Sequence, residues 1–247
     1  MIFVKSEKEI LGMRAANSAA ARVLESVEKY ILPGVTTKEI EIVAAKKMKD
    51  LGVKSACYGY YGYPGLICTS VNSVVVHGIP SELKLKKGDI ISVDVSVIKE
   101  GFCGDVAKTY PVGEIVPSAQ RLLDAALRAL NAAVDICRSG IRVGDISNAI
   151  QSVAESRGFS VVRDFTGHGI GRKMHEDPFI PNYGLPGTGP RIPKNSCLAI
   201  EAMINQGGWE IQVLKDNWTA VVKDGTLSAH FEQTVLVGET GAEVLTV

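Results

Sequence analysis

The sequence predicts an α+β protein built from two related halves, and three observations support this class. Segments with helical apolar spacing alternate with segments rich in valine and isoleucine, in the order two helices, strands, two helices, strands. Corresponding segments of the two groups have similar sequences. The hydrophobic content of 46% over 247 residues is sufficient for a substantial core.

The first half begins with two helices. Residues 6–30 carry apolar side chains at helical spacing and are followed by the stop signal Leu-Pro-Gly at 32–34. Residues 36–52 supply a threonine cap, an acidic first turn and a closing glycine. Strands are predicted at 66–76 and 89–98, and the latter pairs as a hairpin with 102–112.

The second half has the same order. Helices are predicted at 118–138 and 143–157, followed by strands near 160–166, 196–204, 209–222 and 229–237. Residues 33–52 align without gaps on 139–158, which places Gly34 on Gly140 and Glu39 on Asp145. For this segment alone, the alternative to a true repeat is that helix caps resemble one another by chance. We expect one domain over 1–247, with halves of roughly 1–115 and 116–247.

The repeat also pairs acidic residues. Residues 85–95 align on 192–202, which places Asp94 on Glu201, and the segment from Asp105 resembles the segment from Glu232. Strand alternation puts Asp94 on a face opposite to a row of valines. If the hairpin loop has an even number of residues, Asp105 lies on the same face as Asp94, directly opposite or one diagonal step away.

Four carboxylates at corresponding strand positions predict a cation site. Like charges that face each other in an apolar setting repel strongly, so positive charge is expected between them, and two divalent ions would cancel a formal charge of minus four. The alternative is that each acid is solvated or paired with a lysine. Flanking glycines let His168 approach a metal closely, as a nitrogen ligand. His77 and His175 suit acid and base roles.

Composition excludes several classes of protein. The 27 basic and 27 acidic residues balance, so neither nucleic acid nor an anionic membrane is an expected partner. No apolar run approaches 18 residues and no export signal is evident. The five cysteines, at 57, 68, 103, 137 and 197, are scattered and never form a CxxC pair, which indicates a reducing cytoplasm.

Five motifs, taken in order, resemble those of bacterial type I methionine aminopeptidases. They are GYPGLICTSVNSVVVHGIP, DVSVIKEGFCGDVAKT, GHGIGRKMHE, AIEAMIN and DNWTAVVKDGTLSAHFEQTVLV, and the similarity spans essentially the whole chain. The resemblance implies the pita-bread fold of the creatinase and aminopeptidase superfamily, with two pseudo-symmetric halves around a curved antiparallel sheet forming a single catalytic domain.

The resemblance also implies the site. Its two divalent ions, drawn from manganese, iron(II), cobalt or zinc, would be held by Asp94, Asp105, His168, Glu201 and Glu232. Glu201 would act as general base, His175 would stabilise the oxyanion, and His77 would contact the scissile amide. The substrate would be the N-terminus of a nascent chain with a small second residue. The implied methionine pocket contains Cys57, Tyr60, Tyr63, Cys68, Met174 and Trp218. Asn72, Val74 and Ser228 match a sodium or potassium site.

The chain departs from the family pattern at three positions. Ala202 stands where a proline usually follows the ligand glutamate, Met174 replaces an aromatic residue, and Lys173 replaces a small residue. None of these changes removes a ligand, although Met174 makes one pocket wall more pliable and its effect on selectivity is left open.

Two other functions occur on the same scaffold. A prolidase-like peptidase shares the five ligands but usually carries an additional N-terminal domain, which we expect to be absent because a helix starts by residue 6. A non-catalytic binding protein on this scaffold would be expected to lose ligands and gain basic patches. The span from His175 to Glu201 leaves no room for the helical insertion of type II aminopeptidases. We expect a monomer that associates transiently with the ribosome.

Overall fold

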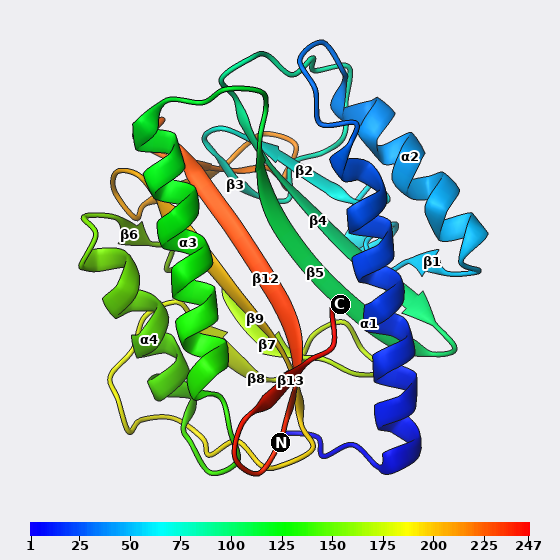
Figure 1. Cartoon of the computed structure of the whole chain (residues 1–247), viewed down its shortest axis with the longest axis vertical. Helices are drawn as coiled ribbons and strands as arrows, with labels where there is room; N and C mark the ends of the chain where they lie inside the picture. The colour runs from blue at the N-terminus through cyan, green and yellow to red at the C-terminus, as the bar shows by residue number, and fades with distance from the viewer.

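The computed structural model describes residues 1–247 and contains four long helices on one face of a ten-stranded sheet. The helices are α1 (Glu7–Glu28), α2 (Thr37–Asp50), α3 (Pro117–Ile136) and α4 (Val143–Glu155). Figure 1 shows α1 and α2 as one pair and α3 and α4 as the other, with β5 and β12 visible between the pairs. The predicted α+β class is confirmed.

The large sheet is antiparallel throughout and runs in the order β1–β4–β5–β12–β9–β7–β8, with β2, β6 and β13 attached at its sides. Its strands are β1 (Lys54–Ser55), β2 (Cys68–Val71), β4 (Ile90–Lys99), β5 (Phe102–Pro111), β6 (Ser160–Val161), β7 (Thr166–Gly169), β8 (Glu176–Pro181), β9 (Cys197–Asn205), β12 (Ser228–Val237) and β13 (Ala242–Val244). A smaller sheet contains β3 (Val74–Val76), β10 (Ile211–Val213) and β11 (Ala220–Val222). A short 3-10 turn, η1 (Tyr60–Gly62), precedes β2.

The two halves build their helix entries in the same way. The N–H of Thr36, which caps α2, donates to Glu39 at 2.7 Å, and the N–H of Arg142 before α4 donates to Asp145 at 2.8 Å. These are the acidic residues that the internal alignment superimposes. Isolated bridges also correspond, Thr36 with Lys84 and Arg142 with Arg191.

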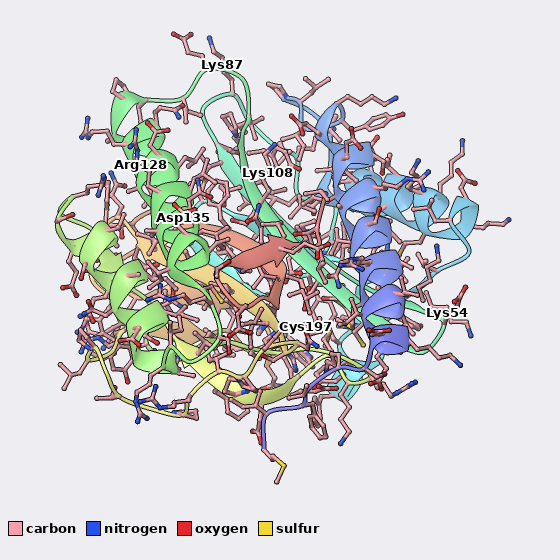
Figure 2. All side chains as sticks on the ribbon, turned by 60° about the horizontal axis from the view of Figure 1, so that its bottom comes forward. Lys54, Lys87, Lys108, Arg128, Asp135 and Cys197 are labelled. Atoms are coloured by element: carbon pink, nitrogen blue, oxygen red, sulfur yellow. The ribbon has the colours of Figure 1, made fainter.

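The apolar core lies between the helices and the sheet. One cluster joins α1 and α2 to β4 and β5, and a second joins α3 and α4 to β9 and β12. Charged side chains of both signs lie around the periphery, including Lys54 and Lys87 (Figure 2). None of the helices combines the length and the apolar character that crossing a bilayer requires.

Three predicted strands differ from the structure. The segment 66–76 is not one strand, because the chain turns at Asn72, whose φ is 55°, and β2 and β3 belong to separate sheets. The segments 160–166 and 209–222 are likewise each divided between two short strands. Strand β8 was not predicted, because two prolines and two acids hide its alternation. Prolines are tolerated there because β8 is an edge strand.

Helix α1 packs directly on β5 at Gly104. A Cβ atom at this glycine would lie 2.4 Å from the carbonyl oxygen of Ala16. The close approach lets the buried side chain of Asn17 accept a hydrogen bond from the N–H of Asp105 at 3.1 Å. The contact between helix and strand therefore fixes the backbone of one predicted metal ligand.

We expect Gly104→Ala to lower the free energy of unfolding by about 1–3 kcal/mol, because the added methyl group forces α1 away from β5. Urea denaturation would measure the loss. Gly241→Ala is the matched control, since a Cβ there meets nothing within 4 Å. Equal stability of the two variants would contradict the role of this contact.

Candidate metal centre

The hairpin of β4 and β5 brings two aspartates to one face of the sheet. Its loop contains only Glu100 and Gly101, both with positive φ, and the register pairs Ser96 with Asp105 and Asp94 with Ala107. Asp94 and Asp105 are therefore one diagonal step apart. Neighbouring residues such as Val93 and Val106 belong to the cluster beneath the helices, so the aspartates point away from it.

Strands β9 and β12 add the two glutamates on the same face. Glu201 pairs directly with Glu232, and Glu232 pairs with Ala107 on its other side. A row across four strands therefore contains Asp94, Ala107, Glu232 and Glu201. Because Ala107 is small, the carboxylates on either side of it can approach a common space. Each half therefore contributes one pair of acids, as the repeat predicts. Asp94 and Asp105 are diagonal neighbours, whereas Glu201 and Glu232 lie directly opposite each other.

His168 reaches this space from β7, where it pairs with Ala199. Its Nδ1 lies 3.0 Å from the carbonyl oxygen of Gly169, which is a hydrogen bond that places the proton on Nδ1. The Nε2 lone pair then faces the carboxylates, and Nε2 lies 3.9 Å from Oδ2 of Asp105. One ligand atom each from Asp105, His168 and Glu232 lies within 4.8 Å of the others.

The electrostatics of the pocket require compensation by positive charge. Burial raises the pKa of Asp94 to about 7, and burial together with the charge of Asp94 raises the pKa of Asp105 well above its usual range. Burial and Asp105 do the same to the pKa of Glu232. Oδ1 of Asp94 is buried without a hydrogen-bond partner. These are properties of carboxylates arranged for a cation, because charged acids are otherwise rarely left buried and unpaired.

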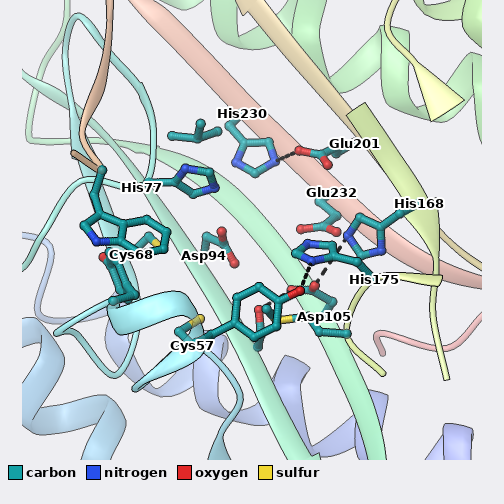
Figure 3. A pocket seen from close by; sticks show the side chains of 16 residues that line it. Cys57, Cys68, His77, Asp94, Asp105, His168, His175, Glu201, His230 and Glu232 are labelled. Carbon is teal, nitrogen blue, oxygen red and sulfur yellow. Dashed lines mark hydrogen bonds and ion pairs between the residues drawn. The ribbon is translucent and has the colours of Figure 1, made fainter. Parts of the chain in front are cut away.

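Glu201 lies outside the three-residue cluster and interacts with His230. Nε2 of His230 lies 3.1 Å from Oε2 of Glu201 and has no other polar partner (Figure 3). Burial alone would raise the pKa of Glu201, but the imidazole lowers it below the usual value. His230 was not among the predicted site residues. Strand alternation could have found it, because it precedes Glu232 by two residues and so shares its face.

His77 and His175 line the same pocket. The ring of His175 lies 4.3 Å from that of His168 between centroids, and its Nδ1 lies 2.7 Å from the hydroxyl of Tyr60. Burial and the neighbouring His168 lower the pKa of His175 to about 4, so the imidazole is neutral near pH 7. His77 has a φ of 60°, and burial lowers its pKa. Strained backbone of this kind is concentrated at functional sites.

An apolar wall completes the pocket, whose cavity measures about 130 Å³. This wall contains the predicted residues Cys57, Tyr60, Tyr63, Cys68, Met174 and Trp218, together with Val76, which was not predicted. The rings of Tyr63 and Trp218 meet edge to face at 5.1 Å. The residues proposed for a monovalent cation lie elsewhere. There the N–H of Ser228 donates to the carbonyl of Asn72 at 2.9 Å, and Val74 begins β3.

The donor set fits divalent transition metals. Carboxylate oxygens combined with one imidazole suit manganese, iron, cobalt or zinc, whereas calcium and magnesium prefer oxygen alone. The hydrogen bond between His168 and Gly169 is the outer support that ligating histidines typically have. Asp105, His168 and Glu232 would hold an ion directly. Asp94 and Glu201 lie around this centre as further carboxylates.

Comparison with known proteins identifies relatives of the whole chain. The model of metallopeptidase family M24 matches residues 12–239. Methionine aminopeptidase 1 of Bacillus subtilis is 44% identical over 246 residues, covering 100% of this chain and 99% of the relative. Methionine aminopeptidase A of Synechocystis is 46% identical, covering 99% of this chain and 97% of the relative.

Solved structures agree with the sequence relatives. A methionine aminopeptidase from Thermotoga maritima is 47% identical and superposes with a TM-score of 0.98, covering 100% of this chain and 99% of that one. A prolidase from Pyrococcus furiosus superposes at 0.82 with 20% identity, covering 99% of this chain and 65% of that one, which shows a shared fold alone. The predicted pita-bread fold is confirmed.

The acidic pocket predicts an unusual pH dependence of stability without metal. The pKa values of Asp94, Asp105 and Glu232 are raised on folding, so the folded chain retains protons that the unfolded chain loses. Stability should fall from pH 6.5 to 8, by up to about 1.4 kcal/mol per pH unit for each such proton. The three histidines with lowered pKa values oppose this fall only in part, because their unfolded imidazoles lose the remaining protons between about pH 6.5 and 7.5, whereas the raised pKa of His230 adds to the fall.

Urea unfolding in the presence of a chelator would measure this trend. Asp94→Asn should reduce the slope, since it removes one buried acid, and manganese should bind the wild type more tightly as pH rises because the ligands must lose protons. Metal-free stability that increases over this pH range would refute the raised pKa values.

Proposed function

The chain belongs to metallopeptidase family M24, and from this premise we propose that it is a metal-dependent aminopeptidase that removes the N-terminal methionine of peptides. The observation that carries the proposal is the convergence of Asp105, His168 and Glu232 beside a wall of sulfur and aromatic side chains. The cluster of ligands suits metal-assisted hydrolysis. The sulfur and aromatic wall suits the unbranched thioether side chain of methionine.

The catalytic part rests on two divalent ions, with Asp94, Asp105, His168, Glu201 and Glu232 as ligands. When bound, such ions supply positive charge that lets water act as a nucleophile near neutral pH. Glu201 is suited to accept a proton from that water, because the adjacent His230 keeps its carboxylate ionised. Manganese, iron(II), cobalt and zinc all match the donors.

The two pocket histidines would act on the scissile peptide. If the Tyr60 hydroxyl donates to Nδ1 of His175, then Nε2 carries the proton and can donate to the developing oxyanion. Its low pKa keeps this donor neutral through the reaction. His77 follows β3 in the chain, and its ring packs against that of Phe165 with the centroids 5.2 Å apart. It would contact the scissile amide.

The apolar wall would select methionine. Cys57 and Cys68 form a buried cluster with Tyr63, against which Trp218 packs. Thioether sulfur makes favourable contacts with aromatic rings, so this wall suits the methionine side chain. Met174 lines the pocket beside His175 and gives a flexible boundary. A small second residue in the substrate would be preferred.

The cellular setting follows from the proposed substrate. All five cysteines are free, which suits a reducing cytoplasm, and nascent chains are the natural source of N-terminal methionine. We propose a monomer with transient ribosome association and a single catalytic domain. A sodium or potassium ion would bind near Asn72, Val74 and Ser228.

Peptide hydrolysis tests this function directly. Metal-free protein reconstituted with manganese, iron or cobalt should release methionine from Met-Ala-Ser, while peptides with proline in the second position should be poorer substrates. Amino-acid analysis would quantify the products. Cleavage of the proline-containing peptides alone would replace the proposal with a prolidase-like activity.

His77→Ala should retain metal but lower kcat/KM by about 100-fold, because the imidazole contacts substrate and is not a ligand. Calorimetry with manganese and steady-state kinetics on Met-Ala-Ser would separate the two effects. Unchanged turnover in this variant would remove His77 from the mechanism.

A further inference from the structure

A buried ion pair lies outside the pocket, at the residue that follows His175 in the chain. Nζ of Lys5 is 2.6 Å from Oε2 of Glu176, and each side chain is only 7% exposed. The penalty for dehydrating such a pair is comparable to its attraction, so apolar residues of similar size would stabilise the fold equally well. The presence of charge at this point therefore needs a reason other than stability.

The pair joins two segments that are distant in sequence, which we call the N-terminal arm (residues 1–9) and the histidine loop (residues 171–177). The arm is itself anchored, because the N–H of Lys5 donates to the carbonyl of Asn195 at 2.8 Å. A second ion pair joins Nε of Arg172 to Oε1 of Glu9 at 3.4 Å. The terminal ammonium of Met1 also contacts Asp177.

The histidine loop is built around this pair. Oε1 of Glu176 accepts a hydrogen bond from the N–H of Lys173 at 3.3 Å, so one carboxylate binds both the arm and the loop backbone. Gly171 leaves the necessary space. A Cβ atom there would lie 2.3 Å from Nζ of Lys5 and 2.5 Å from Oε1 of Glu176.

We infer that Lys5 and Glu176 are positioning residues for His175. The imidazole contacts the Tyr60 hydroxyl through Nδ1, and the arm fixes the residue that follows His175 in the chain. An ion pair suits this task because it specifies one geometry, whereas an apolar contact tolerates sliding. The kinetic consequence rests on the proposed function, because it assumes that His175 acts on the substrate.

Four variants test the inference. Lys5→Met and Glu176→Gln each break the pair, the double variant Lys5→Met/Glu176→Leu replaces it with apolar groups, and Gly171→Ala separates the partners without changing charge. Lys5→Met should lower Tm by at least ~5 °C, whereas the double variant should recover most of this loss. In manganese-loaded enzyme, all four should lower kcat on Met-Ala-Ser at least about ten-fold with little change in KM.

A second readout is independent of activity. The chain has only four histidines, so the imidazole ¹⁵N spectrum of metal-free protein is simple, and His175→Ala would assign its signals. The His175 signals should shift or broaden in all four variants, while manganese affinity stays unchanged. Arg14→Met is the matched control, since it breaks an exposed ion pair from α1 to Glu243 on β13, away from the histidine loop.

Two results would overturn the positioning role. One is a double variant that keeps both the wild-type kcat and the wild-type His175 signals. The other is equal changes in the Arg14→Met control. Absence of hydrolysis by the wild type, combined with displaced His175 signals in the variants, would instead refute the proposed function and support the positioning role.

Discussion

The organising constraint of this molecule is the mutual repulsion of carboxylates in a pocket with little water. Asp105 and Glu232 are almost inaccessible to solvent, and Asp94 is partly buried. The charge of Asp94 raises the pKa of Asp105, and both aspartates raise the pKa of Glu232. Such a group is tolerable only when it is protonated or bound to cations. The antiparallel register aligns these residues on one face of the sheet. The helices cover the opposite face. Protonation or a bound cation is thus a condition of the folded state, and a divalent ion would satisfy this condition.

The two halves contribute similar elements but different roles. Each supplies a helix pair and a central strand pair, and each strand pair carries two acids. The first half adds Tyr60 and His77, while the second adds His168, His175 and His230. Duplication therefore gives an approximately symmetric set of carboxylates, and the asymmetric placement of imidazoles gives the pocket a direction. Figure 3 shows His168, Glu232 and Asp105 on one side of the pocket and His77 and Cys68 on the other.

Features encoded by local sequence could be predicted, whereas features created by distant contacts could not. Alternation in residues 90–99 and a two-residue loop place Asp94 and Asp105 on one face, and the caps at Ser6 and Thr36 mark two helix starts. Strand β8 escaped prediction because an edge strand can contain prolines. The contact of His230 with Glu201 and that of Lys5 with Glu176 depend on tertiary packing, which neither spacing nor composition records.

The position of β12 has a consequence for how the chain reaches its final state. This strand lies between β5 and β9, so the hairpin of the first half keeps an open edge until a segment near the end of the chain is inserted. Open edges invite pairing with other chains, and contacts between distant segments form slowly. Until β12 pairs, the edge of β5 is therefore open to association with other chains. Because Glu232 lies on the same strand, pairing of β12 closes the sheet and also brings the last of the four carboxylates into the pocket.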